Sequence, residues 1–162
     1  MSSGSGKNTA IFAISAVCAI ALDQFLKVLV ASFMEPGQTV TLIPHVLSLT
    51  YTTNTGAAFG LLRGSGQIVF LAALIIVVLV LAWFFISRDR AETWSFVGLG
   101  LMIGGAVGNL IDRVFRGHVL DFFDFGWWPV FNIADLAIVT GVIIILIDYA
   151  RELWRAEGET EP

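Results

Sequence analysis

Charged residues are scarce in this sequence: Asp, Glu, Lys and Arg make up 14% of its 162 residues, whereas 57% are hydrophobic. A soluble domain of this size cannot bury so much apolar surface. The mean hydropathy is strongly positive, and the composition therefore indicates an integral membrane protein. The apolar runs are longer and more continuous than the strands of a membrane β-barrel, which predicts a bundle of helices.

Cysteine and histidine are also rare, which excludes several kinds of site. The single cysteine, Cys18, lies in an apolar run, so no intramolecular disulfide can form. The two histidines, His45 and His118, lack the spacing and the companions of a zinc site, so a metalloprotease is not expected. A Ser65–His118 dyad has no supporting motif. No dinucleotide, phosphate-loop or nucleic-acid-binding pattern is present.

Four apolar stretches are close to the length of about 20 residues that crosses ~30 Å of hydrocarbon. They are residues 9–33, 68–86, 94–111 and 130–147. The sequence thus predicts an all-α membrane protein with four transmembrane helices, forming a single domain over residues 1–162. For the first stretch, a cleaved signal peptide with an apolar core at residues 10–22 is the less favoured alternative, because apolar sequence resumes at Val28.

Lysine and arginine near the span ends predict the orientation, because cytoplasmic loops favour positive charge. Five fall on one side and three on the other. This bias predicts that both termini are cytoplasmic and that residues 34–67 and 112–129 lie on the outer side. The acidic tail, residues 156–162, is expected to be a solvated end. The five are Lys7, Arg88, Arg90, Arg151 and Arg155, and the three are Arg63, Arg113 and Arg116.

The first outer segment, residues 34–67, has alternating polar and apolar residues in two places. They are residues 38–43 and 46–53, with Pro44 and His45 between them. A period of two with Thr, Val and Tyr predicts a small β-hairpin, which would lie at the membrane surface. No internal repeat is evident, so a transporter built from repeats has little support.

Two features of the predicted spans indicate how the helices pack. Gly100, Gly104 and Gly108 recur at a spacing of four residues. Small residues at that spacing let helices approach closely in lipid, so we interpret these glycines as a packing face. In the first span Asp23 and Lys27 are four residues apart, on one helix face where they can form an ion pair.

A polar cluster follows these glycines at the outer end of the third span. Asn109, Asp112, Arg113 and Arg116 share one helix face if the helix continues past the apolar run. For Asp112 we favour a structural pair with an arginine. For Arg113 there are two alternatives, a structural pair or a role in substrate binding, since a guanidinium can hold an extended peptide backbone by its N–H groups.

Asp135 is an ionisable residue within a predicted span. If the fourth helix starts near Val130, Asp135 lies ~7.5 Å along its axis, just below the outer surface. Such a residue is a functional candidate, and its natural partner is a second carboxylate, either Asp121 or Asp124. Spacing alone does not choose between them. Two close carboxylates tend to share one proton, which supplies a base to activate water and an acid to protonate a departing amine.

Aromatic residues surround these aspartates. Trp127 and Trp128 are interpreted as anchors at the membrane–water interface. The same interpretation is favoured for Phe122, Phe123 and Phe125. The stretch is therefore expected to lie at the level of the lipid headgroups.

Five ordered sequence boxes resemble the bacterial lipoprotein signal peptidases (signal peptidase II, or prolipoprotein signal peptidase), a family of aspartic peptidases. The boxes are DQFLK at 23–27, NTGAAF at 54–59, GGAVGNLIDR at 104–113, GHVLDF at 117–122 and FNIAD at 131–135. Members of this family have four spans, and they cut the signal peptide from a prolipoprotein just before a cysteine that carries diacylglycerol.

The resemblance implies that Asp121 and Asp135 are the catalytic pair and leaves Asp124 as a bystander. The family's outer β-cradle corresponds to the alternating segment between the first two spans, while the linker at residues 122–134 looks shorter than in many members. Polar groups that hold the substrate or orient the pair are implied at Asn54, Asn109, Arg113 and Asn132. Supporting positions are Asp23, Asp112 and Gly108.

The resemblance predicts an intramembrane aspartic endopeptidase of the bacterial cytoplasmic membrane, with its active site near the outer surface. Its expected partners are diacylglyceryl-modified prolipoproteins and membrane lipids, with no nucleic acid, and it is expected to be a monomer. No metal or organic cofactor is needed, because two carboxylates and one water suffice. The alternatives are a proton-coupled transporter that uses Asp135 and Arg113, or a lipid-binding structural subunit. Neither explains why carboxylates and asparagines converge.

Overall fold

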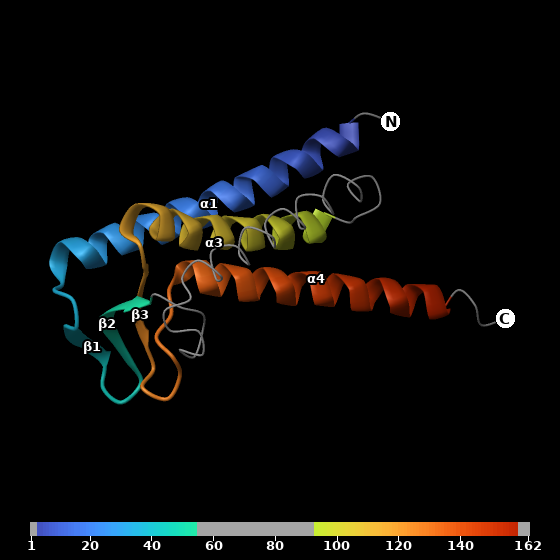
Figure 1. The fold of residues 1–162 in the computed structure, drawn as a ribbon. Helices are drawn as coiled ribbons and strands as arrows, with labels where there is room; N and C mark the ends of the chain where they lie inside the picture. Colours follow the sequence, from blue (N-terminus) through green and yellow to red (C-terminus); the bar gives the residue numbers. More distant parts are fainter. Residues whose placement is uncertain (1–2, 55–92, 159–162) are drawn as a thin grey trace.

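The computed structural model describes residues 3–54 and 93–158 (Figure 1). Within these residues, three helices each hold a stretch long and apolar enough to cross a membrane, namely Gly6–Phe33, Thr93–Arg116 and Ile133–Arg151. The helices are α1 (Ser3–Phe33), α3 (Thr93–Arg116) and α4 (Ile133–Gly158). The predicted second span, residues 68–86, lies outside the described residues, so the number of four helices stays a prediction. Also outside are Arg63, Ser65, Arg88, Arg90 and residues 159–162.

The observed helix limits differ from the predicted spans where polar residues extend or cap a helix. The third span, predicted at residues 94–111, continues as α3 to Arg116, so the polar cluster at its end is helical. The fourth span was predicted from residue 130, which was wrong, because α4 begins at Ile133, after the capping residue Asn132. Asp135 therefore lies in the first turn of α4. At its other end α4 runs to Gly158, past the predicted residue 147.

Helix α3 packs against both α1 and α4, and glycines allow both approaches. A Cβ atom on Gly104 would lie 2.6 Å from the backbone oxygen of Ala16 in α1. On another side of α3, a Cβ atom on Gly105 would lie 2.3 Å from the backbone oxygen of Ala134 in α4. Real Cβ atoms do not come so close, so the predicted role of the glycines in close packing is confirmed.

A three-stranded antiparallel sheet, in the order β1-β2-β3, covers one end of the helices. Strands β1 (Thr39–Ile43) and β2 (Leu47–Asn54) form the predicted hairpin, with His45 at a φ of 62° in the turn. Strand β3 (Val119–Asp124) was not predicted, since residues 112–129 were interpreted only as an outer segment. Its Val, Leu and Phe residues are strand formers. Pairing of β3 with β2 joins the two outer segments in one sheet.

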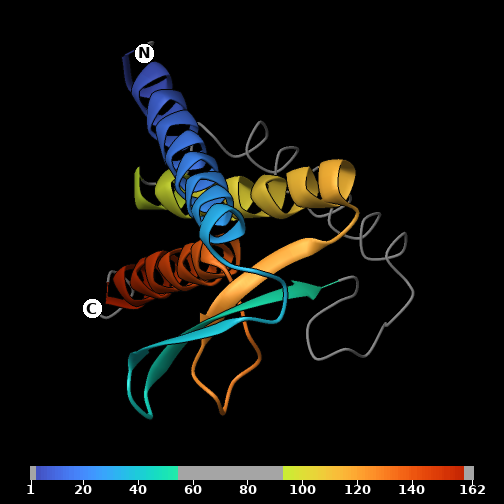
Figure 2. The ribbon, with the colours of Figure 1, turned by 90° about the vertical axis from the view of Figure 1, so that its left-hand side faces the viewer.

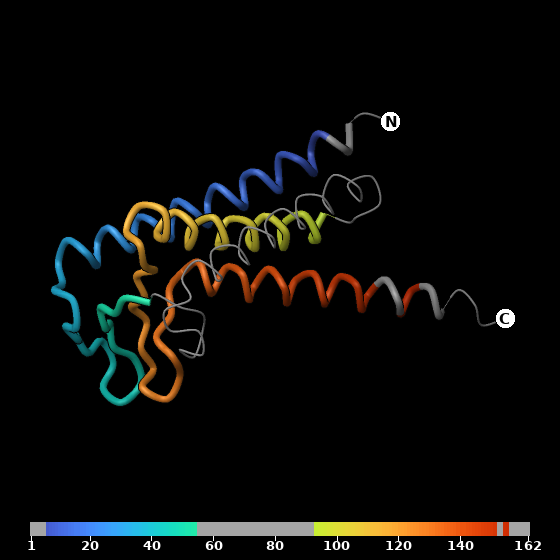
Figure 3. The backbone as a smooth tube through the Cα atoms, in the orientation of Figure 1, coloured from blue at the N-terminus to red at the C-terminus, as the bar shows by residue number. Residues whose placement is uncertain are grey.

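The sheet and the two chain termini lie at opposite ends of the bundle (Figures 1 and 2). In Figure 3 the chain enters α1 and leaves α4 at the same end. Phe122 is only 1% exposed and packs with Val30 and Leu120, so its interpretation as an interface anchor was wrong. The Phe122 side chain lies on the face of β3 that packs against Val30 of α1. Trp127, in contrast, is 80% exposed, as expected of an anchor.

Candidate active site

Asp121 is buried on β3, where two asparagine side chains hold its carboxylate. The Nδ2 group of Asn132 donates to Oδ1 at 2.6 Å, and the Nδ2 group of Asn54, at the end of β2, donates to Oδ2 at 3.1 Å. The side chain is 2% exposed. Both oxygens therefore accept a hydrogen bond from a neutral donor, and neither is paired directly with a cation in these contacts.

Asp124 lies on the same strand, but its carboxylate makes hydrogen bonds outside the cavity. Residues three apart on a strand point to opposite faces, so Asp124 faces away from Asp121. Its carboxylate accepts hydrogen bonds from the Thr50 hydroxyl at 2.7 Å and from the backbone N–H of Gly126 at 2.8 Å. These contacts tie β3 to β2 and to the following turn, which is a structural role.

Asp135 is fixed by the way in which α4 begins. The side chain of Asn132 accepts a hydrogen bond from the backbone N–H of Asp135 at 3.0 Å, and the Asp135 carboxylate accepts one from the backbone N–H of Asn132 at 3.1 Å. This reciprocal pair is a capping box, with Asp in place of the more frequent Glu. Because Asn132 also donates to Asp121, one residue holds both aspartates.

Asn109 and Arg113 approach the same aspartates from α3. The Nδ2 group of Asn109 donates to Oδ1 of Asp135 at 2.9 Å, while its Oδ1 atom accepts from Asn132 at 3.1 Å. One guanidinium nitrogen of Arg113 donates to the backbone oxygen of Asn109 at 3.1 Å. The structure thus brings together both predicted catalytic residues and all four predicted orienting residues.

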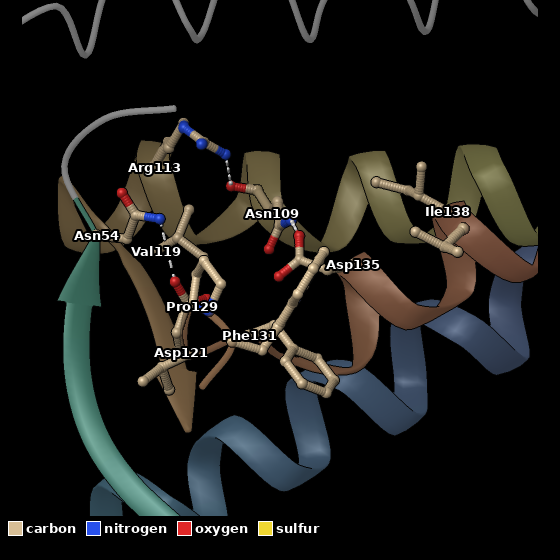
Figure 4. A pocket seen from close by; sticks show the side chains of 12 residues that line it. Asn54, Asn109, Arg113, Val119, Asp121, Pro129, Phe131, Asp135 and Ile138 are labelled. Carbon is tan, nitrogen blue, oxygen red and sulfur yellow. Dashed lines mark hydrogen bonds between the residues drawn. The ribbon is translucent and has the colours of Figure 1, made fainter. Parts of the chain in front are cut away.

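A cavity of about 320 Å³ is lined by Asp121, Asp135, Asn54, Asn109 and Arg113 (Figure 4). Figure 4 shows the two carboxylates on different elements, Asp121 on β3 and Asp135 on α4, beside the same cavity. Apolar side chains from α4 and the β3–α4 loop complete the wall. Within residues 3–54 and 93–158, no three His, Cys, Asp or Glu side chains are grouped as metal ligands would be. The cavity combines an apolar wall with a few convergent polar groups, as binding sites do.

The electrostatic setting favours a protonated Asp121. Burial, and then the negative charge of Asp135, raise the pKa of Asp121 to about 7. Hydrogen bonds from Asn54 and Asn132 and the charge of Lys27 act in the opposite direction, with smaller effects. A carboxyl group with a pKa near 7 beside a second carboxylate can keep its proton at neutral pH.

Comparison with known proteins identifies the family. The sequence profile described as "Signal peptidase (SPase) II" matches residues 15–151. This chain belongs to the signal peptidase II family. The lipoprotein signal peptidase of Syntrophomonas wolfei is 44% identical over 137 residues, which cover 82% of this chain and 91% of that protein. The lipoprotein signal peptidase of Mycobacterium avium is 41% identical over 138 residues, which cover 82% of this chain and 74% of that protein.

Two solved structures of bacterial membrane enzymes share the fold. One has a TM-score of 0.78 at 33% identity and covers 96% of this chain and 92% of its own. The other has a TM-score of 0.73 at 36% identity, with coverage of 88% and 91%. Together with the three apolar helices, this membership makes the chain a multi-pass membrane protein and a protease. Neither the relatives nor the structures support the transporter alternative.

The supporting residues of this signal peptidase II family member form a buried ion network beside the aspartates. The predicted Asp23–Lys27 pair is confirmed, with 2.8 Å between Oδ2 and Nζ. The predicted pairing of Asp112 with an arginine is also confirmed, since Arg116 contacts its Oδ1 atom. A Cβ atom on Gly108 would lie 2.6 Å from Oδ2 of Asp23, so a larger residue would push the network out of place.

Two members of this network, Lys27 and Gln24, make contacts that the sequence did not predict. Lys27 was expected only to pair with Asp23, yet its ammonium group also lies 2.9 Å from Asp112. Gln24 was not singled out, although its side chain donates to the Gly108 backbone oxygen at 3.1 Å and to Asp112 at 3.3 Å. The high cost of a charged residue within an apolar span is the signal that could have drawn attention to Lys27.

Proposed function

We propose that this protein removes signal peptides from prolipoproteins as an aspartic endopeptidase, with Asp121 and Asp135 as its catalytic pair. The observation that carries the proposal is that Asn132 holds both carboxylates beside one cavity. The names of the relatives supply the substrate class, since both are lipoprotein signal peptidases. The raised pKa of Asp121 supports the aspartic mechanism.

In this proposal Asp121 holds the shared proton and Asp135 is ionised. Asp135 takes a proton from a water molecule, whose oxygen attacks the carbonyl carbon of the scissile peptide bond. Asp121 gives its proton to the carbonyl oxygen at the same time, which produces a tetrahedral gem-diol. The carbon–nitrogen bond of this intermediate then breaks: the proton gained by Asp135 passes to the departing amine, and Asp121 takes a proton from one of the two hydroxyl groups, which leaves the carboxylic acid. The two aspartates thus exchange roles, and no charge needs to leave the site.

The asparagines and Arg113 would position the reacting groups. Asn54, Asn109 and Asn132 donate to the two carboxylates and thereby restrict their orientation. Arg113 lines the cavity, and its guanidinium has further N–H groups that would donate to carbonyl oxygens of the substrate backbone. Fixed donors of this kind contribute to catalysis because they need no reorganisation during the reaction.

The position of the site suits a substrate anchored in lipid. The cavity lies at the sheet end of the helices, where the exposed Trp128 lines it and contacts the exposed Trp127. Acyl chains hold a diacylglyceryl cysteine at the membrane boundary, so the bond before it lies near that depth. We propose that this end faces the outer side of the bacterial cytoplasmic membrane, that both termini are cytoplasmic, and that the enzyme acts as a monomer.

The test of the proposed function is a cleavage assay with the purified protein and two forms of one precursor. One form carries diacylglycerol on its cysteine and the other does not. We expect cleavage of the lipidated form just before the cysteine, and little of the other. Equal cleavage of both forms, or cleavage of neither, would contradict the proposed substrate class.

A further inference from the structure

Lys27 is completely buried within α1, with 0% of its side chain exposed. A buried ammonium group is costly unless its three N–H donors find acceptors. Three acceptors surround it: Oδ2 of Asp23 at 2.8 Å, Oδ2 of Asp112 at 2.9 Å and Oδ1 of Asn109 at 3.0 Å. Each of these three partners in turn supports one of the two aspartates beside the cavity.

Asp23 holds the backbone next to Asp135. Its Oδ1 atom accepts a hydrogen bond from the backbone N–H of Ala134 at 2.9 Å, while its Oδ2 atom contacts Lys27. Ala134 directly precedes Asp135 in the first turn of α4, where N–H groups have no partner within the helix. A carboxylate from α1 thus fixes the start of α4.

Asp112 holds the backbone next to Asp121 in the same manner. Its Oδ2 atom accepts a hydrogen bond from the backbone N–H of Leu120 at 3.2 Å and also contacts Lys27. Leu120 directly precedes Asp121 on β3. Two elements that are distant in the sequence, β3 and α4, are therefore each anchored one residue before their aspartate, and Lys27 joins the two anchors.

Asn109 receives the third N–H of Lys27, and this contact sets the direction of its amide. Because Oδ1 of Asn109 accepts from both Lys27 and Asn132, the Nδ2 group faces Oδ1 of Asp135. A reversed amide would place an N–H group against two donors. Lys27 therefore also fixes which atom of Asn109 meets Asp135.

We infer that Lys27 is a positioning residue, which sets the relative placement of Asp121 and Asp135 through Asp23, Asp112 and Asn109. This inference rests on the proposed function, because the two aspartates matter only if they react. The competing explanation is that Lys27 serves the fold alone by neutralising buried carboxylates. Loss of positioning acts on turnover more than on substrate binding, which separates the two explanations.

The first test compares Lys27→Met with Lys7→Met, which changes the other lysine of α1, an exposed one. A displacement of 1 Å in an active site can cost about 10²-fold in rate, and we expect kcat of Lys27→Met to fall on that order. We expect KM to change less than about threefold. A lipopeptide with a statine group, which mimics the transition state, should bind more weakly by the same factor as the loss in kcat/KM. Lys7→Met should match the wild type.

Since Lys27→Met leaves buried Asp23 without its cation and Asp112 with Arg116 alone, a second variant removes the charges of Asp23, Lys27 and Asp112 at once. It combines Asp23→Asn, Lys27→Met and Asp112→Asn, whose amide oxygens can still accept from Ala134 and Leu120. We expect this triple variant to unfold near the wild-type temperature. Its kcat should still be at least about tenfold lower than that of the wild type. A near-normal kcat would overturn the inference. A failure to fold would also overturn it, because Lys27 would then serve the bundle as a whole.

Asp135→Asn separates the failure of this inference from failure of the proposed function. If Asp135→Asn is inactive while Lys27→Met retains near-normal kcat, the inference is wrong and the proposed function stands. If Asp135→Asn retains turnover, the proposed function is wrong and the inference falls with it. If both lose turnover while Lys7→Met does not, both stand.

Discussion

Asp121 and Asp124 lie three residues apart, and their neighbours give them different chemistry. Asp121 is buried among amide donors beside the cavity, whereas Asp124 accepts from a hydroxyl and from a turn N–H. Burial next to Asp135 raises the pKa of Asp121 to about 7. Under the proposed mechanism, Asp121 must be protonated for turnover.

The pH dependence of kcat/KM tests this assignment. As the pH rises through about 7, Asp121 loses its proton, so we expect kcat/KM to fall on the alkaline side. The hydrogen bond from Asn54 lowers this pKa, so Asn54→Ala should raise it and move the alkaline limb to higher pH. Asn8→Ala, on α1 far from the site, is the control. An alkaline limb that does not move, or moves to lower pH, would contradict the assignment.

Among single residues, the sequence predicted most of the polar side chains that the structure places around the cavity. The cost of a carboxylate in an apolar span led to Asp135 and to its need for a partner. The choice of Asp121 came from the family resemblance, and the structure adds its physical reason, which is the alternation of side chains along β3. The contacts of Lys27 with Asn109 and Asp112 could not be predicted, because they join residues more than 80 positions apart in the sequence.

The start of α4 is the element on which the site depends most. Asn132 caps this helix through its side-chain oxygen and uses its Nδ2 group to reach Asp121 and Asn109. The sequence predicted the helix but placed its start three residues early, since hydropathy does not register a capping box. The predicted start placed Asp135 five residues into the helix, whereas the observed start places it in the first turn.

Substitution of Asn132 separates capping from catalysis. Serine is a good capping residue but is too short to reach Asp121, whereas alanine neither caps nor donates. We expect Asn132→Ser to unfold at a higher temperature than Asn132→Ala, by an amount that corresponds to about 1 kcal/mol. Both should lose most of their kcat. A nearly active Asn132→Ser would show that the contact with Asp121 is dispensable.

For the molecule as a whole, the sequence predicted the three membrane helices that the structure describes, their glycine contacts and the hairpin. It did not predict that β3 completes the sheet. The strand is short, and its phenylalanines were interpreted as interface anchors and not as strand residues. The pairing of β3 with β2 brings Asn54 to Asp121. The helix at residues 68–86, the single domain and the orientation in the membrane remain predictions.

The orientation can be tested by labelling single cysteines in spheroplasts with a maleimide that does not cross membranes. In a Cys18→Ala background, Thr41→Cys places a thiol on the exposed strand β1, and Lys7→Cys places one near the N-terminus. The excess of positive charge at the terminal end predicts labelling of Thr41→Cys in intact spheroplasts, and of Lys7→Cys only after lysis. The reverse pattern would place the site on the cytoplasmic side.

The most direct test of the proposed catalytic pair is single-turnover cleavage of a lipidated precursor by three matched variants. They are Asp121→Asn, Asp135→Asn and Asp124→Asn, each checked for a wild-type unfolding temperature. We expect the first two to lose at least about 10³-fold in rate, and Asp124→Asn to remain within about tenfold of the wild type. Near-normal cleavage by Asp121→Asn or Asp135→Asn would contradict an aspartic mechanism at this site.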